Sequence, residues 1–222
     1  MRSYLDACGI TRALDVVGER WAIPVIRELI FGPRRYSDLA TALPGVSTNI
    51  LGARLKELVK AGVVVKRRLA PPTPANVYEL TPWGAALEPV LIELGRWGSR
   101  TAVDLSHQAL SASSLALSLK TTFDAHAAAG VELDAQLVMG EDCFGVHIGS
   151  GVLTIGRDAP HTGRASGLRL HADPPTMASY VYQGLEAAGT AFDAIRIEGS
   201  RGSAELFTRC FTLPEPPTKG TL

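Results

Sequence analysis

The chain has 222 residues, of which 20% are charged and 46% hydrophobic, with 22 Lys/Arg balanced by 22 Asp/Glu. This composition excludes an intrinsically disordered protein, and no apolar run reaches the ~20 residues that a transmembrane helix needs. The opening residues MRSYLDACGI lack the apolar core of a secretory leader. We therefore expect a globular, cytoplasmic protein with no membrane partner and with room for two small domains.

The net charge of zero conceals a difference between the two halves. Residues 1–105 hold 14 Lys/Arg and 10 Asp/Glu, whereas residues 106–222 hold 8 and 12. The excess is concentrated in residues 34–68, with eight basic and two acidic side chains. A local positive field in a neutral chain predicts a polyanion partner for that segment.

The cysteines and the common enzyme motifs give little support for catalysis. Cys8, Cys143 and Cys210 form neither a disulfide framework nor a CxxC motif. The chain also lacks GxGxxG, GxxxxGK[ST], HExxH and GxSxG motifs. We expect a protein that is not an enzyme and has no cofactor or metal. An enzyme with a DNA-binding head stays a distant alternative, because Glu141-Asp142, Glu186 and scattered histidines are its only titratable candidates.

Two short helices are predicted over residues 10–31, both facing the core. Their apolar residues recur at steps of three and four: Leu14, Val17, Trp21, Val25 and Leu29. Phe31-Gly32-Pro33 ends the second helix, and Ser37 is predicted to cap a third that stops before Pro44.

A further helix is predicted to begin after the cap residue Ser47 and to close at Gly62. Its buried side is predicted to contain Ile50, Leu51, Leu55, Leu58 and Val59. Two short helices joined by a few residues that include Gly have the sequence form of a helix-turn-helix.

A β-hairpin, or wing, is predicted next, from residues 63–69 and 76–80 with a Pro-rich break between them. Thr81-Pro82 then signals the start of one long helix that continues to about Ser99. This helix carries more apolar surface than a small winged domain needs for itself.

Residues 104–113, rich in small polar side chains, are the predicted linker between a domain at 1–103 and a domain at 114–222. Helices are predicted at 114–128, 175–185 and 201–211, and strands at 133–139, 144–148, 152–155, 168–172 and 194–198. These elements predict an α+β domain with an antiparallel-rich sheet.

Short motifs in the first half occur in order over roughly residues 5–100. They are Cys8, Ala13-Leu14-Asp15-Val16-Val17-Gly18, Arg20-Trp21, Arg27-Glu28-Leu29, Gly32-Pro33-Arg34-Arg35-Tyr36-Ser37-Asp38-Leu39, Leu43-Pro44-Gly45-Val46-Ser47, Leu51, Arg54-Leu55, Glu57-Leu58, Gly62, Tyr78-Glu79-Leu80-Thr81 and Gly84. This half resembles the HxlR family of bacterial winged helix-turn-helix regulators. The resemblance implies a DNA-binding homodimer in which the helix after Ser47 enters the major groove, the wing touches the DNA backbone, and the N-terminal and Thr81–Ser99 helices dimerise.

The second half carries a more diffuse set of motifs: Phe123-Asp124, His171-Ala172-Asp173-Pro174, Tyr182-Gln183-Gly184 and Ile195-Arg196-Ile197-Glu198-Gly199-Ser200. It is similar to a sterol-carrier-protein-type domain. The resemblance implies an apolar tunnel between sheet and helices that takes a lipid-like or polyketide-like molecule. The candidate lining residues are Phe123, Met139, Phe144, Leu153, Ile155, Met177, Tyr180, Val181, Leu185 and Phe192. For any single one, an ordinary core role is the alternative.

Two groups of residues in the first half are predicted to contact DNA. The residues expected to reach base edges, together with their helix cap, are Ser47, Thr48, Asn49, Gly52, Ala53 and Lys56. The expected phosphate contacts are Arg34, Arg35, Arg54, Arg67 and Arg68. As an alternative, Lys66, Arg67 and Arg68 only protect an edge strand from aggregation.

Cys8 occupies the place of a family cysteine that senses oxidants or electrophiles in some members, and Arg12 one turn away could favour its thiolate. His147 and His171 are expected at outward strand positions, as a polar pocket end, a metal pair or solvated side chains.

We therefore expect a transcriptional regulator, most simply a homodimeric repressor of a double-stranded DNA operator, controlled by a small hydrophobic effector in the C-terminal domain. The open alternatives are a C-terminal domain that serves only dimerisation or docking, and redox or electrophile sensing through Cys8.

Overall fold

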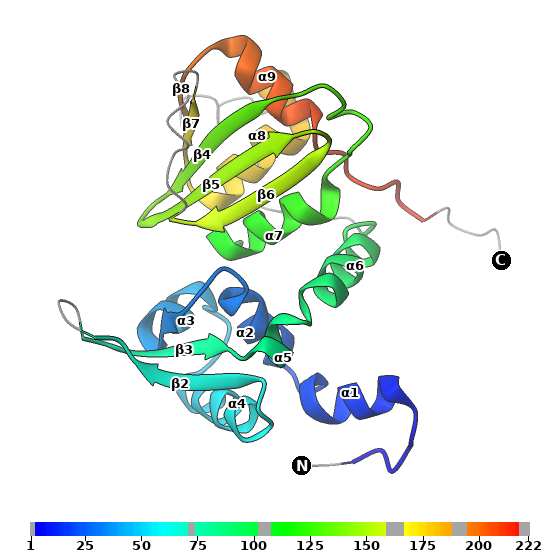
Figure 1. Cartoon of the computed structure of the whole chain (residues 1–222), viewed down its shortest axis with the longest axis vertical. Coiled ribbons are helices and arrows are strands. Elements are labelled where there is room, and N and C mark those ends of the chain that lie inside the picture. Colours follow the sequence, from blue (N-terminus) through cyan, green and yellow to red (C-terminus); the bar gives the residue numbers. More distant parts are fainter. Residues whose placement is uncertain (1–2, 71–73, 102–107, 159–166, 188–194, 218–222) are drawn as a thin grey trace. The chain divides into compact units, whose positions relative to one another are not determined.

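The computed structural model describes residues 3–70, 74–101, 108–158, 167–187 and 195–217. The chain folds as two compact units, Met1–Leu91 and Ile92–Leu222. Figure 1 shows short helices and a small sheet in the first unit, and a larger sheet with helices on one face in the second. No helix in the described ranges is long and apolar enough to cross a membrane.

The first two helices behave differently, although the sequence predicts a core-facing role for both. α2 (Ala22–Leu29) buries Val25, Ile26 and Leu29. α1 (Gly9–Val17) leaves Ile10 73% and Leu14 41% exposed. The prediction is therefore wrong for α1. An apolar stripe shows which side of a helix is hydrophobic, but it does not show whether another element packs against that side.

The helix-turn-helix consists of α3 (Tyr36–Ala42) and α4 (Thr48–Lys60). α3 begins two residues earlier than predicted, with Arg35 as its N-cap: the Asp38 carboxylate accepts a hydrogen bond from the Arg35 N–H (3.0 Å), so Ser37 is not the cap. Ser47 caps α4 as predicted, accepting from the Ile50 N–H at 3.4 Å. The buried side of α4 is narrower than predicted. It contains Leu51, Leu55 and Leu58, whereas Ile50 and Val59 are exposed.

The wing is present as predicted, formed by β2 (Val64–Arg68) and β3 (Asn76–Leu80) in antiparallel pairing. Gly62, with φ +77°, turns the chain from α4 into β2. A third strand, β1 (Arg34–Arg35), pairs with the other side of β3. Two residues are too short a run to show alternation, so the sequence did not predict this strand.

The single long helix predicted from Thr81 is two helices, α5 (Pro82–Ala85) and α6 (Glu88–Gly98). The predicted start is confirmed, since Thr81 Oγ1 accepts from the Gly84 N–H (3.1 Å) and donates to the Gly62 carbonyl (2.7 Å). Pro89 explains the break: it has no N–H to continue the ladder and is tolerated only in a first helical turn.

The second unit is α+β, as predicted. Its helices are α7 (Ala112–Thr122), α8 (Pro174–Ala187) and α9 (Arg201–Arg209). Its strands are β4 (Leu133–Met139), β5 (Asp142–Gly149), β6 (Val152–Arg157), β7 (Leu168–His171) and β8 (Arg196–Glu198). The predicted linker lies partly outside the described residues, and α7 already begins at Ala112. α7 also ends at Thr122, short of the predicted residue 128.

Within the described residues the strand order is β6-β5-β4-β7-β8, with α7, α8 and α9 on one face (Figure 1). β7 pairs with β4 in parallel, whereas the other neighbours are antiparallel. The sheet is therefore mixed, because β7 crosses to the far side of the β4–β6 meander and does not pair with β6.

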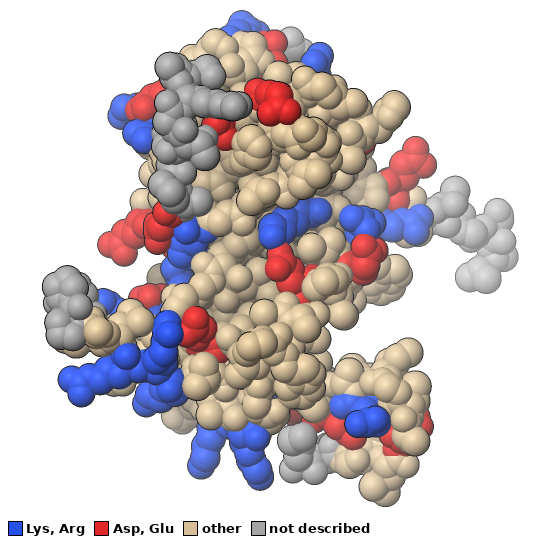
Figure 2. Space-filling view, in the orientation of Figure 1, with Lys and Arg blue, Asp and Glu red and all other residues tan. Residues whose placement is uncertain are grey.

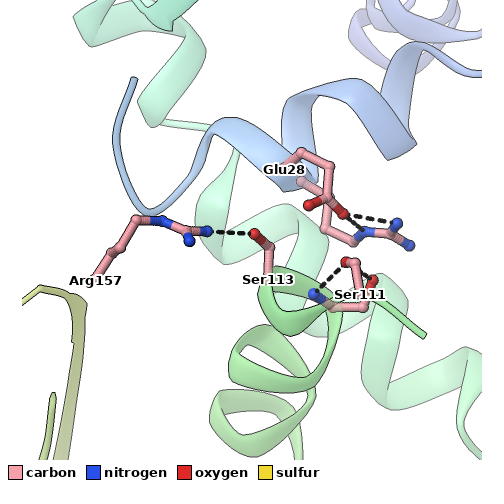
Figure 3. A network of polar contacts seen from close by, with 6 residues as sticks. Glu28, Ser111, Ser113 and Arg157 are labelled. Atoms are coloured by element: carbon pink, nitrogen blue, oxygen red, sulfur yellow. Dashed lines mark hydrogen bonds and ion pairs between the residues drawn. The ribbon is translucent and has the colours of Figure 1, made fainter. Parts of the chain in front are cut away.

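Arg157 ties α7 to the sheet in this unit. Its side chain is only 10% exposed and forms an ion pair with Asp142. Nη2 donates to the Ser113 hydroxyl at 2.7 Å, as Figure 3 shows, and the guanidinium lies 4.6 Å from the Phe144 ring centroid. Such a buried charge is stable only because it is paired and hydrogen-bonded.

Gly84 tests the packing of α5 against β2. A Cβ at this position would overlap the Val63 carbonyl oxygen, so we expect Gly84→Ala to lower the free energy of unfolding of the first unit by about 2 kcal/mol. Urea unfolding followed by the fluorescence of Trp21 and Trp83 measures this change. The matched control is Gly52→Ala in α4, where a Cβ would meet no atom within 4 Å. It should stabilise by about 0.5–1 kcal/mol. Equal midpoints for the two variants would contradict the packing described.

Candidate nucleic-acid interface

The side of α4 opposite its buried leucines is polar and open. Asn49, Ala53, Lys56 and Lys60 are exposed there and Gly52 is half-buried, while Thr48 is exposed in the first turn of the helix. An α-helix of these 13 residues is about 20 Å long and fits the major groove of B-DNA, where amide and ammonium groups can pair with base edges. The structure therefore brings together the residues that the sequence predicts for base contact.

Basic side chains also gather on the wing. Lys66, Arg67 and Arg68 of β2 are exposed, and Figure 2 shows Lys and Arg over the β2–β3 hairpin and over α4. Arg67 pairs with Glu79 at 3.0 Å, and Lys66 lies 6.0 Å from the Tyr78 ring centroid. On β1, Arg35 is exposed and Arg34 half-buried.

Arg54 is placed differently from the other predicted phosphate contacts. Its side chain is only 12% exposed, forms an ion pair with Glu57 on the same helix, and lies 3.7 Å from Glu19. In this arrangement Arg54 connects α4 to the segment between α1 and α2.

Trp21 fixes the turn that precedes α4, a role that the sequence did not predict. Its backbone is left-handed (φ +76°), which is strained for a bulky residue. The indole lies against Gly45, where a Cβ would be only 2.9 Å from Trp21 Cη2. The Arg20 guanidinium lies 5.6 Å from the ring centroid. Helical spacing identified Trp21 only as a core residue, because the pattern of apolar residues carries no information about backbone φ angles.

Tyr36 provides a second tie to the start of α4. Its hydroxyl donates to the Thr48 carbonyl at 2.7 Å, linking α3 directly to the first turn of the next helix. The sequence placed Tyr36 within a family motif but did not predict this contact. The indole against Gly45 and the Tyr36 hydrogen bond thus both position the start of α4.

Cys8 lies exposed at the N-terminus of α1 as a free thiol. The Ile10 and Thr11 backbone N–H groups hold the pKa of this thiol below its ordinary value. The sequence pointed to Arg12 for this effect, but the amide groups of the helix start provide it. By contrast, burial raises the pKa of Cys143 and of Cys210.

The predicted ligand-lining residues of the second unit belong mainly to its core. The buried ones are Met139, Phe144, Ile155, Met177, Tyr180 and Val181. Phe123 and Leu153 are half-buried. The Leu185 side chain and Phe192 lie outside the described residues.

The two strand histidines are not brought together. His147 Nδ1 lies 2.8 Å from Asp134 Oδ1, and His171 Nε2 lies 3.3 Å from Glu198 Oε1. The described part of the chain contains no group of three His, Cys, Asp or Glu side chains placed to hold a metal.

Comparisons with known proteins find relatives of the first half of the chain. The model of the HxlR-like helix-turn-helix family matches residues 16–105. YvaP, an uncharacterized HTH-type transcriptional regulator of Bacillus subtilis, is 40% identical over 89 residues, which are 40% of this chain and 82% of YvaP. YodB, an HTH-type transcriptional regulator of the same organism, is 36% identical over 89 residues, which are 40% of this chain and 79% of YodB. The solved structure of reduced YodB matches 44% of this chain and 96% of its own, with 30% identity and a TM-score of 0.39.

The environment of Cys8 predicts an order of thiol reactivity. Because its pKa is lowered, a larger fraction of Cys8 than of Cys143 or Cys210 is thiolate at any pH below the ordinary thiol pKa. We expect iodoacetamide to modify Cys8 first, with a pH midpoint below that of free cysteine. Peptide mass spectrometry after timed alkylation from pH 6 to 9 measures all three thiols in one sample. Modification of Cys143 before Cys8 would contradict this order.

Proposed function

The chain belongs to the HxlR-like helix-turn-helix family of transcriptional regulators, and we propose that it binds a two-fold DNA operator as a homodimeric repressor. The observation that carries this proposal is the open polar face of α4 beside a basic wing, in a chain whose net charge is zero. Binding to DNA phosphates requires a local cluster of cations, and such a cluster can exist in a protein whose net charge is zero.

Each part of this surface has a distinct role in the proposal. Asn49, with Thr48, Gly52, Ala53 and Lys56 on the α4 face, reads base edges, since an Asn amide can pair bidentately with adenine. Arg34, Arg35, Arg67 and Arg68 hold phosphate oxygens and set the register of α4 on the duplex. Arg54 reaches a phosphate only by leaving Glu57 and Glu19, so its first role is to hold α4 in place.

Dimerisation is supported by apolar side chains that the chain leaves open. Ile10 and Leu14 on α1, and Val90 (57%), Leu94 (49%) and Trp97 (72%) on α6, are exposed. A cleft of about 550 Å³ between α1 and α5 is lined partly by Ala13, Val17, Trp83 and Leu87. Burial of these groups against a second copy would remove apolar surface from water, and the two-fold axis of such a dimer would match a palindromic operator.

We further propose that a small hydrophobic effector acts through the C-terminal domain, in line with its sterol-carrier-like sequence motifs. An effector can change operator affinity only by binding the two states of the dimer differently. A typical coupling of roughly 1–3 kcal/mol changes that affinity about 5- to 150-fold.

The DNA proposal is tested first with Arg68, which is exposed on the wing. On a duplex selected from random sequences, Arg68→Ala should weaken binding and reduce the slope of log K against log salt by about one unit. It should do so equally on an unselected duplex, because a phosphate contact carries no sequence information. Fluorescence anisotropy titrations at several salt concentrations measure both slopes. The control is Arg209→Ala on α9, which should bind DNA as the wild type does. If both variants show the same slope of log K against log salt, Arg68 does not contact DNA.

A second candidate function, electrophile sensing, is favoured by the exposure and lowered pKa of Cys8. The thiolate would add to an electrophilic carbon of a signal molecule, and the adduct on α1 would disturb the dimer. We expect N-ethylmaleimide to lower the operator affinity of the wild type at least about fivefold. Cys8→Ser should be unaffected, whereas Cys143→Ser should respond like the wild type. A full response in Cys8→Ser would refute this role.

A further inference from the structure

Ile50 is a large aliphatic residue on the DNA-facing end of α4. Helical spacing assigns it to the buried side, yet 45% of it is exposed. It lies in the first turn of α4, directly after Thr48 and Asn49, and the Ser47 cap holds its N–H. The fold therefore presents an apolar group in the turn where the polar residues proposed to read bases also lie.

The direction of this side chain follows from helix geometry. At about 100° per residue, Ile50 lies roughly 60° around the helix from Ala53 and 80° from Lys60, at one edge of the open face. Val59, the other exposed aliphatic residue of α4, is 38% exposed. It lies nine residues, or about 14 Å, further along the helix axis than Ile50, near the C-terminal end of α4.

The chemistry of the major groove identifies the group that an isoleucine would meet. Base edges there offer hydrogen-bond donors and acceptors together with one aliphatic group, the C5-methyl of thymine. In the proposed complex, the exposed cations of the wing and of α4 would hold the duplex close to this turn. Contact between two apolar groups removes both from water.

We propose that Ile50 contacts the C5-methyl group of a thymine and so contributes to the choice of a T·A pair in each half-site. This inference rests on the proposed DNA binding. It adds an apolar contact to the polar residues that the sequence had indicated, and it assigns that contact to a residue predicted to belong to the core.

The experiment replaces single thymines by uracil, which removes only the methyl group. Operator duplexes are first selected from random sequences with the full-length wild-type chain, and the dissociation constant is then measured for each single thymine-to-uracil duplex. We expect one thymine in a half-site whose replacement weakens wild-type binding about fourfold, the factor that corresponds to ~0.8 kcal/mol for one buried methylene-sized group. Ile50→Ala should bind the thymine and uracil duplexes equally at this position.

Val59→Ala is the matched control, because it removes an aliphatic group of similar exposure from the same helix. It should keep the fourfold preference for thymine, and Ile50→Val should keep most of it. The inference is overturned if Ile50→Ala retains the wild-type sensitivity, or if no uracil substitution weakens wild-type binding. Failure of the wild type to enrich any sequence would instead refute the proposed function itself.

Discussion

The left-handed backbone at Trp21 is the constraint on which the helix-turn-helix depends. A bulky residue adopts this conformation at a cost of roughly 1–3 kcal/mol, so contacts around it must offset the strain. Here the indole lies against Gly45, and no larger residue could occupy that position without displacing the ring. The same segment contributes Glu19 beside Arg54 of α4. The loop before α2 thus contacts both the turn before α4 and α4 itself.

This arrangement explains how a neutral chain can present a basic surface. The arginine of α4, Arg54, is paired with Glu57 and largely buried, so it stabilises the position of α4 and adds little to the positive field outside the protein. The exposed cations lie instead on Lys56, Lys60 and the wing, where phosphate oxygens can reach them. The acidic excess of the chain lies beyond residue 105, outside the segment that forms α4 and the wing.

Much of the fold could be predicted because its signals are local. Ser47, Gly62 and Thr81-Pro82 mark element ends through caps and a left-handed turn, and alternation identified the wing and the strands of the second unit. The failures have non-local causes. Periodicity could not show that Ile10 and Leu14 of α1 are exposed, that Ile50 and Val59 lie outside a narrow buried stripe, or that β7 crosses to pair with β4. For the candidate site, the residues of the α4 face were predictable from spacing and charge. The positioning contacts of Trp21, Gly45 and Tyr36 were not, because they depend on tertiary geometry.

The central claim is that α4 and the wing together form the surface that meets DNA. Hydrogen–deuterium exchange of the full chain, with and without a selected operator duplex, tests it most directly, because it reports protection along the whole sequence. The account predicts slower exchange in the peptides that cover residues 47–60 and 64–68, with no change in those that cover 133–157. Protection confined to the second unit, with α4 and the wing unchanged, would contradict it.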